Sequence, residues 1–99
     1  MAANLVVAPE AELDIAEAYV WYENRRIGLG EEFLSAVEAC TEGIRRQPEM
    51  YPEVHDAYRR CLIRRFPYAV FYEYGKGTVT VYSVFHTSRD PRKWRQRLP

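Results

Sequence analysis

An arginine-rich run at residues 58–66 has the clearest potential for chemistry. A strand points successive side chains to opposite faces, so Arg60 and Arg64 should share one face and Arg59 and Arg65 the other. Arginine suits phosphate or carboxylate ligands because its planar guanidinium can bond two oxygens at once. The run therefore predicts binding to an anionic partner. The alternative for each of these arginines is an ion pair with the acidic residues of the same chain.

A histidine followed closely by another arginine forms the second motif, at residues 84–91. Cleavage of RNA needs groups that move protons and cations that stabilise the phosphate. His86 can transfer protons near neutral pH, and an arginine could hold the phosphate. The candidate catalytic residues are therefore His86, Arg65 and Arg89. The alternative is a structural His86 that bonds to the C-terminal tail.

The C-terminal tail mixes cations with one aromatic side chain. Trp94 could stack on a nucleic-acid base, although we favour the interpretation that it pins the tail to the core. Together with the four arginines of residues 58–66, the tail supplies the candidate binding residues. These tail candidates are Arg89, Arg92, Lys93, Trp94 and Arg95.

The two cysteines lie in apolar patterns, and neither has a second cysteine or a histidine at metal-ligand spacing. Cys40 and Cys61 are therefore expected to be reduced, buried thiols, with no metal and no cofactor. No apolar run approaches the roughly 18 residues of a membrane-spanning helix, and residues 1–4 do not resemble a signal peptide. We expect a cytoplasmic protein with no membrane partner.

The formal net charge of zero hides a strong asymmetry along the chain. Residues 1–56 carry four Lys and Arg against twelve Asp and Glu, a net charge of −8. Residues 57–99 carry ten against two, a net charge of +8. This division suggests that one face meets an acidic partner, either nucleic acid or an acidic protein segment. The alternative is that the two halves attract each other across the fold.

Hydrophobic periodicity predicts the elements that position these groups. Phe33, Val37, Cys40 and Ile44 recur at steps of four, three and four, which makes one apolar helical stripe. Acidic residues, including Asp14, stand where the first helix dipole favours anions. The expected elements are a strand at 4–7, helices at 9–26 and 31–46, a loop at 48–57, strands at 59–66, 68–74 and 78–86, and a short basic helix at 91–97.

The order β-α-α-β-β-β predicts an α+β fold, in which a helical hairpin packs on a small antiparallel sheet with a short basic C-terminal helix. Gly-rich segments at 27–30 and 75–77 should turn the chain between the helices and between the last two strands. The 99 residues are expected to form one domain. Both faces of the sheet carry apolar residues, so the face opposite the hairpin is a candidate surface for a partner.

Several short groups then occur in a characteristic order over nearly the whole chain. The groups are Pro9-Glu10-Ala11, Asp14-Ile15, Trp21-Tyr22, Gly28-Leu29-Gly30, Phe33-Leu34, Pro48, Tyr51-Pro52, Arg60 to Leu62, Arg65-Phe66-Pro67-Tyr68, His86, Arg89-Asp90-Pro91 and Trp94. In this order they resemble the RelE/ParE toxin superfamily, in its ParE-like or plasmid stabilisation branch. No single group is specific, but the ordered set is.

The resemblance implies the toxin of a bacterial type II toxin–antitoxin system, neutralised by a cognate antitoxin whose C-terminal segment wraps the toxin. RelE-like members cut mRNA on the ribosome, whereas ParE-like members poison DNA gyrase. The only lysines here are Lys76 and Lys93, so the central strands lack the lysines of the nucleases, and the chain also lacks their terminal aromatic pair. Both departures favour gyrase binding without enzymatic activity. The alternatives are a ribosome-dependent mRNA endonuclease and a nontoxic binding module.

Overall fold

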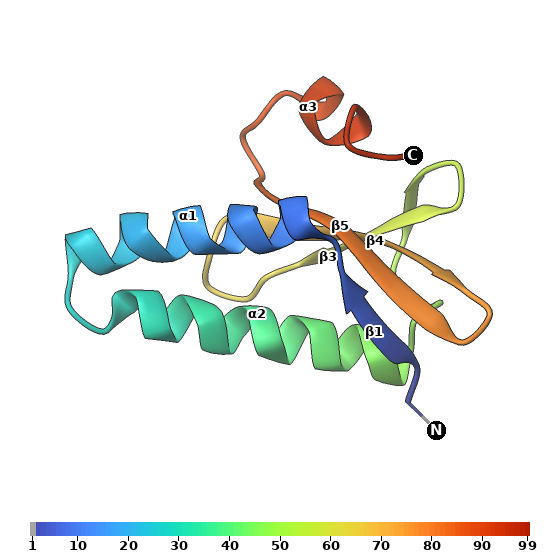
Figure 1. The fold of residues 1–99 in the computed structure, drawn as a ribbon, viewed down its shortest axis with the longest axis horizontal. Coiled ribbons are helices and arrows are strands. Elements are labelled where there is room, and N and C mark those ends of the chain that lie inside the picture. The colour runs from blue at the N-terminus through green and yellow to red at the C-terminus, as the bar shows by residue number, and fades with distance from the viewer. Residues whose placement is uncertain (1) are drawn as a thin grey trace.

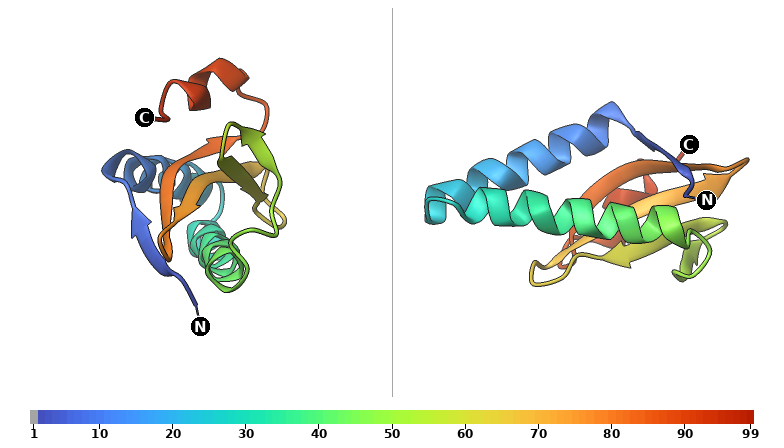
Figure 2. Two further views of the ribbon diagram at one scale, coloured as in Figure 1. Left: turned by 90° about the vertical axis from the view of Figure 1, so that its right-hand side faces the viewer. Right: turned by 90° about the horizontal axis from the view of Figure 1, so that it is seen from below.

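The computed structural model describes residues 2–99 as a five-stranded sheet with helices on both faces (Figure 1). The views in Figure 2 show the long helical hairpin on one side of the sheet and the short C-terminal helix on the other. This arrangement confirms the predicted α+β class. The elements are β1 (Asn4–Val7), α1 (Pro9–Arg25), α2 (Leu29–Arg46), β2 (Glu53–His55), β3 (Tyr58–Leu62), β4 (Tyr68–Gly75), β5 (Thr78–His86) and α3 (Pro91–Arg95).

The sheet has the order β1-β5-β4-β3-β2 and is mixed. β3, β4 and β5 form the predicted antiparallel meander. The expected fourth strand, β1, runs parallel to β5, with Asn4 opposite Thr78 and Val7 opposite Val81. The fifth strand, β2, lies inside the segment that was expected to be only a loop. With three residues and an irregular register against β3, it is too short to leave a periodic signal in the sequence.

The hairpin turn between β4 and β5 was correctly predicted. Lys76 and Gly77 both have positive φ, at 53° and 75°. This is the conformation of a two-residue turn whose twist matches that of the flanking strands. Glycine takes the second position without steric cost.

The turn between the two helices is shorter than expected, because Gly30 lies inside α2 and not in the turn. A Cβ atom added to Gly30 would lie 2.8 Å from ring carbons of Tyr19 in α1, so any other residue would force the Tyr19 ring or the helix to shift. The Glu23 carboxylate accepts the backbone N–H groups of Gly28 at 3.0 Å and Gly30 at 2.9 Å. It therefore satisfies donors that the start of α2 would otherwise leave unpaired. Within residues 2–99, no helix combines the length and hydropathy needed to cross a membrane.

The main core lies between the helical hairpin and the sheet. The predicted stripe of α2 is buried there, where Phe33 and Ile44 are fully enclosed against Tyr72, Val79 and other residues of the strands. A second, smaller core lies on the opposite face. It is built from Ala69, Phe71 and Phe85 of the sheet and Trp94 of α3.

Trp94 stacks on Phe71 with ring centroids 4.4 Å apart and an interplanar angle of 17°. The interpretation of this tryptophan as a pin for the tail is therefore confirmed. It also follows that the chain's own C-terminal helix covers part of the face that the sequence had suggested for a partner.

The arginine-rich strand is shorter than predicted, and this changes the placement of its side chains. β3 ends at Leu62, and Arg64 and Arg65 lie in the turn that leads to β4. Arg65 has a φ of 72°, a left-handed conformation that a strand does not contain. The prediction that each face of the sheet receives two guanidinium groups is therefore wrong. Alternation of strand residues holds only up to Leu62.

The buried stripe of α2 generates a stability test. Replacing Val37 with Asp places an unpaired carboxylate in the main core and should lower the free energy of unfolding by about 3–5 kcal/mol. Ser35→Asp puts the same charge on the exposed face of α2 and should cost no more than about 0.5 kcal/mol. Chemical denaturation of both variants measures the difference. Equal stability of the two variants would show that the stripe does not face the core.

Candidate binding surfaces and the pocket beside His86

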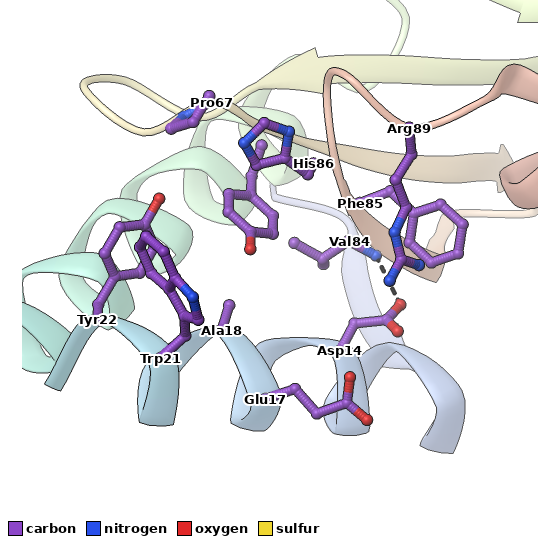
Figure 3. A pocket seen from close by; sticks show the side chains of 11 residues that line it. Asp14, Glu17, Ala18, Trp21, Tyr22, Pro67, Val84, Phe85, His86 and Arg89 are labelled. Carbon is purple, nitrogen blue, oxygen red and sulfur yellow. Dashed lines mark hydrogen bonds between the residues drawn. The ribbon is translucent and has the colours of Figure 1, made fainter. Parts of the chain in front are cut away.

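A pocket of about 490 Å³ lies between α1 and the end of β5 (Figure 3). It forms because β1 pairs with β5 only as far as Val81. The Ala8 N–H donates to the Val81 carbonyl at 2.9 Å, and the chain then turns into α1. The rest of β5 therefore lies beside a helix. The lining residues are Asp14, Glu17, Ala18, Trp21 and Tyr22 of α1, with Pro67, Tyr68, Val84, Phe85, His86 and Arg89.

Asp14 joins three parts of the chain at the edge of this pocket. Its carboxylate accepts the Val84 backbone N–H at 3.0 Å and two hydrogen bonds from the Arg97 guanidinium at 2.9 and 3.0 Å. The Asp14 side chain is only 9% exposed. A carboxylate this well enclosed needs such partners, because its desolvation is otherwise costly. The sequence analysis used Asp14 as an acidic residue near a helix start and as part of a family motif, and nothing in the spacing linked it to Arg97.

His86 ends β5 and is held by the loop that follows it. Its Nδ1 accepts the Ser88 backbone N–H at 3.1 Å, and the Ser88 hydroxyl lies 2.7 Å from the same nitrogen. Because an amide N–H can only donate, the neutral imidazole carries its proton on Nε2. In this tautomer Nδ1 is the acceptor in a bond within the chain, and Nε2 is a donor. The imidazole also packs edge-on against the Tyr68 ring, with centroids 5.2 Å apart.

The groups around His86 make one side of the pocket aromatic. Burial raises the pKa of the Tyr68 hydroxyl, so this group stays protonated at neutral pH. Trp21 is 52% exposed at the rim and meets Tyr22 edge-on. Arg89 places its guanidinium 4.8 Å from the centre of the Phe85 ring. The pocket therefore has an apolar wall beside a cation. This arrangement is suited to binding a side chain or a segment of another protein.

The structure brings together only two of the three candidate catalytic residues. His86 and Arg89 line the same pocket, whereas Arg65 does not line it. Arg65 instead donates to Glu32 of α2 at 2.9 Å. Among the residues that the structure describes, no group of three His, Cys, Asp or Glu side chains is placed to hold a metal ion.

The four arginines of residues 58–66 divide into two kinds. Arg59 is an internal brace, since its guanidinium donates to the carbonyls of Glu49 at 3.0 Å and Tyr51 at 2.6 Å. Arg65 is paired with Glu32, as described above. Arg60 and Arg64 form no ion pair within residues 2–99, and Arg64 is exposed.

One of the two unengaged arginines, Arg60, lies on the same face as an exposed apolar side chain. Arg60 stands opposite Phe71 in the register of the sheet, on the side where α3 packs. Leu62, two residues further along β3, is 59% exposed on the same side. The second face thus retains an open area of mixed cationic and apolar character next to α3.

The candidate binding residues of the tail also divide into residues engaged within the chain and exposed residues. Arg92 pairs with Asp90, the residue that caps α3, and Trp94 is buried. Lys93 and Arg95 are exposed, and the Arg95 guanidinium lies 5.4 Å from the centre of the Trp94 ring. Arg97, which the sequence analysis considered only as part of the basic tail surface, forms the ion pair that holds the tail to Asp14.

Comparison with known proteins agrees with this architecture. The family model described as "ParE toxin of type II toxin-antitoxin system, parDE" matches residues 5–91. A solved structure described as "Chromosomal ParDE TA system from P. aeruginosa" is similar at a TM-score of 0.64 and 16% sequence identity. The match covers 85% of this chain and 95% of that chain, and at this identity it shows a shared fold. No curated protein sequence matches the chain.

The contacts of Asp14 with Val84 and Arg97, which we call the Asp14 junction, generate a second test of stability. Arg97→Gln leaves an enclosed carboxylate without its guanidinium and should lower the free energy of unfolding by about 1–2 kcal/mol. The double variant Asp14→Asn, Arg97→Gln should lose less than the sum of the single variants, because the two side chains act as one unit. Arg92→Gln is the matched control, because its ion pair with Asp90 is exposed and should not change stability measurably. Additive effects of the two junction variants would contradict a coupled pair.

Proposed function

Because the chain belongs to the ParE toxin family of type II toxin–antitoxin systems, we propose that a cognate antitoxin neutralises it and that it poisons DNA gyrase by binding. The observation that carries the binding mechanism is the state of His86. Its Nδ1 is occupied by Ser88, and the neighbouring Tyr68 hydroxyl has a raised pKa. Cleavage of RNA would need a base to accept the proton of the attacking hydroxyl, and neither group is prepared for that task.

The chain lacks two features of the nucleases, namely lysines in the central strands and a terminal aromatic pair. Both departures favour gyrase as the target. The surface proposed for this contact is the basic end of the molecule around α3. Lys93 and Arg95 are exposed there, and Arg89 extends the cationic surface toward the pocket. Trp94 holds α3 on the sheet by stacking on Phe71, and Arg97 holds the tail through its bond to Asp14.

The antitoxin segment is proposed to dock on the second face of the sheet, beside α3. The open area there places Arg60 on the same face as the exposed Leu62 side chain, and the exposed Arg64 follows in the turn after β3. An acidic and apolar segment that folds on binding would match both features. Arg59 and Arg65 are less suited to this contact than the sequence suggested, since each is already bonded within the chain.

The mechanism is tested by comparing two sets of variants in bacterial growth assays. Lys93→Glu together with Arg95→Glu should abolish toxicity, whereas His86→Gln should have a mild effect. These charge reversals are cleaner than deletion of residues 92–99, because the deletion would also remove Trp94 and Arg97 and so damage the fold. Lys76→Glu, in the β4–β5 turn, is the matched control for reversal of an exposed cation.

The readouts separate the two kinds of toxin. A gyrase poison should induce DNA-damage signalling while transcripts stay intact, and the purified toxin should inhibit DNA supercoiling by gyrase. Ribosome-dependent transcript cleavage that His86→Gln eliminates would overturn the binding mechanism. Thermal melting of each variant confirms that lost toxicity does not reflect lost folding.

The antitoxin surface is tested by binding measurements with the antitoxin encoded beside the toxin. Arg60→Glu with Arg64→Glu should weaken binding by about tenfold or more and flatten its dependence on salt, since fewer ion pairs form. Lys76→Glu again serves as the control and should leave the affinity unchanged. Unchanged affinity in the double variant would remove these arginines from the interface.

A further inference from the structure

The two cysteines form a buried pair that has no part in the proposed contacts with gyrase or antitoxin. Cys40 lies on the core-facing stripe of α2, and Cys61 lies in β3 with its side chain in the same core. Their Sγ atoms are 2.8 Å apart, and both residues are free thiols. The side chains are almost fully enclosed, at 8% and 5% exposed. Sequence reasoning treated them as two separate thiols, because residues 21 positions apart carry no local sign of contact.

We propose that Cys40 and Cys61 form a redox modification site, in which a hydroperoxide converts the two thiols into an intrachain disulfide between α2 and β3. A disulfide needs its two sulfurs about 2.05 Å apart, so a shift of less than 1 Å from the present contact is sufficient. No large movement of either element is required. The site is independent of the proposed target and of the antitoxin.

The reaction proceeds in two balanced steps. The Cys61 thiolate attacks one oxygen of hydrogen peroxide, so that an S–O bond forms, the O–O bond breaks and water leaves after protonation. The Cys40 sulfur then attacks the resulting sulfenic acid, so that the S–S bond forms and the S–O bond breaks. The hydroxide leaves as a second water with the Cys40 proton. The thiols lose two electrons and two hydrogens, and one peroxide is reduced to two waters.

The surroundings assign the first attack to Cys61. The Cys40 thiol donates to the Cys61 sulfur, and this bond lowers the pKa of Cys61 against the opposing effect of burial. The nearby Tyr51 hydroxyl lowers the pKa of Cys61 further. The same thiol–thiol bond, together with burial, raises the pKa of Cys40. Because the thiolate is the nucleophile, Cys61 reacts first and Cys40 resolves the intermediate.

Residues 47–52, which we call the cover segment, place the Tyr51 hydroxyl against Cys61, and we infer that this segment controls access to the pair. Tyr51 of this segment lies against α2, since a Cβ atom added to Gly43 would stand 2.9 Å from the Tyr51 hydroxyl. Arg59 holds the segment through the Glu49 and Tyr51 carbonyls. The Tyr72 hydroxyl holds it through the Pro48 carbonyl at 2.7 Å. An oxidant therefore reaches Cys61 when this segment lifts.

The test uses the purified full chain treated with hydrogen peroxide, then denatured and alkylated with N-ethylmaleimide. Intact mass should show a monomer two hydrogens lighter that takes up no alkylating reagent, and peptide mapping should join Cys40 to Cys61. Reduction with dithiothreitol should restore two alkylation sites. Two alkylated thiols after treatment of the folded protein, or oxidation only to sulfinic acids or intermolecular dimers, would overturn the proposal.

Single variants assign the two roles. In Cys40→Ser the remaining Cys61 should form a sulfenic acid that dimedone traps, whereas in Cys61→Ser the remaining Cys40 should react about tenfold more slowly. Tyr72→Phe removes one bond to the cover segment with minimal change in shape and should speed disulfide formation severalfold. Tyr82→Phe is the control, because the Tyr82 hydroxyl bonds Glu73 and not the cover segment. It should leave the rate of disulfide formation unchanged. Equal rates for Tyr72→Phe and Tyr82→Phe would contradict control by the cover segment.

Discussion

The structure depends most on one enclosed carboxylate, that of Asp14. It lies in the second turn of α1, beside the half of β5 that β1 does not pair with. There it accepts a backbone N–H of β5 that would otherwise be unpaired, and it binds the guanidinium of Arg97 in the tail. A buried backbone donor and a nearly buried charge each carry a large penalty when alone. By satisfying each other, they lock α1, β5 and the C-terminus into one geometry.

The pocket and the second face both follow from that junction. With α1 held over the end of β5, the aromatic side chains of Trp21 and Tyr68 are brought beside His86 and Arg89. With the tail held at Arg97, α3 lies on the sheet and Trp94 stacks on Phe71. The basic surface of α3 is therefore presented by a fixed helix, which is the kind of support that a binding site needs.

The division of charge along the chain is used in part within the fold, which was one of the two interpretations that the sequence left open. Three ion pairs join the acidic half to the basic half, at Asp14–Arg97, Glu32–Arg65 and Glu53–Arg59. These three ion pairs neutralise the charges of Arg59, Arg65 and Arg97 within the fold. Other cations, including Arg60, Arg64, Lys93 and Arg95, have no such partner within residues 2–99 and are the ones assigned to external anions in the proposed function.

The sequence by itself determined the helices, the meander and the stripe from Phe33 to Ile44, because hydrophobic periodicity and turn residues act over a few neighbouring positions. It also indicated the family, through the order of short motifs. Tertiary structure alone decided the parallel pairing of β1, the Asp14–Arg97 pair, the contact of Cys40 with Cys61 and the use of Arg59 as a brace. Each of these joins residues that are distant in sequence, or depends on where a strand ends. The left-handed turn at Arg65 ends the alternation after Leu62, and no local pattern shows which arginine a distant carbonyl or carboxylate will bind.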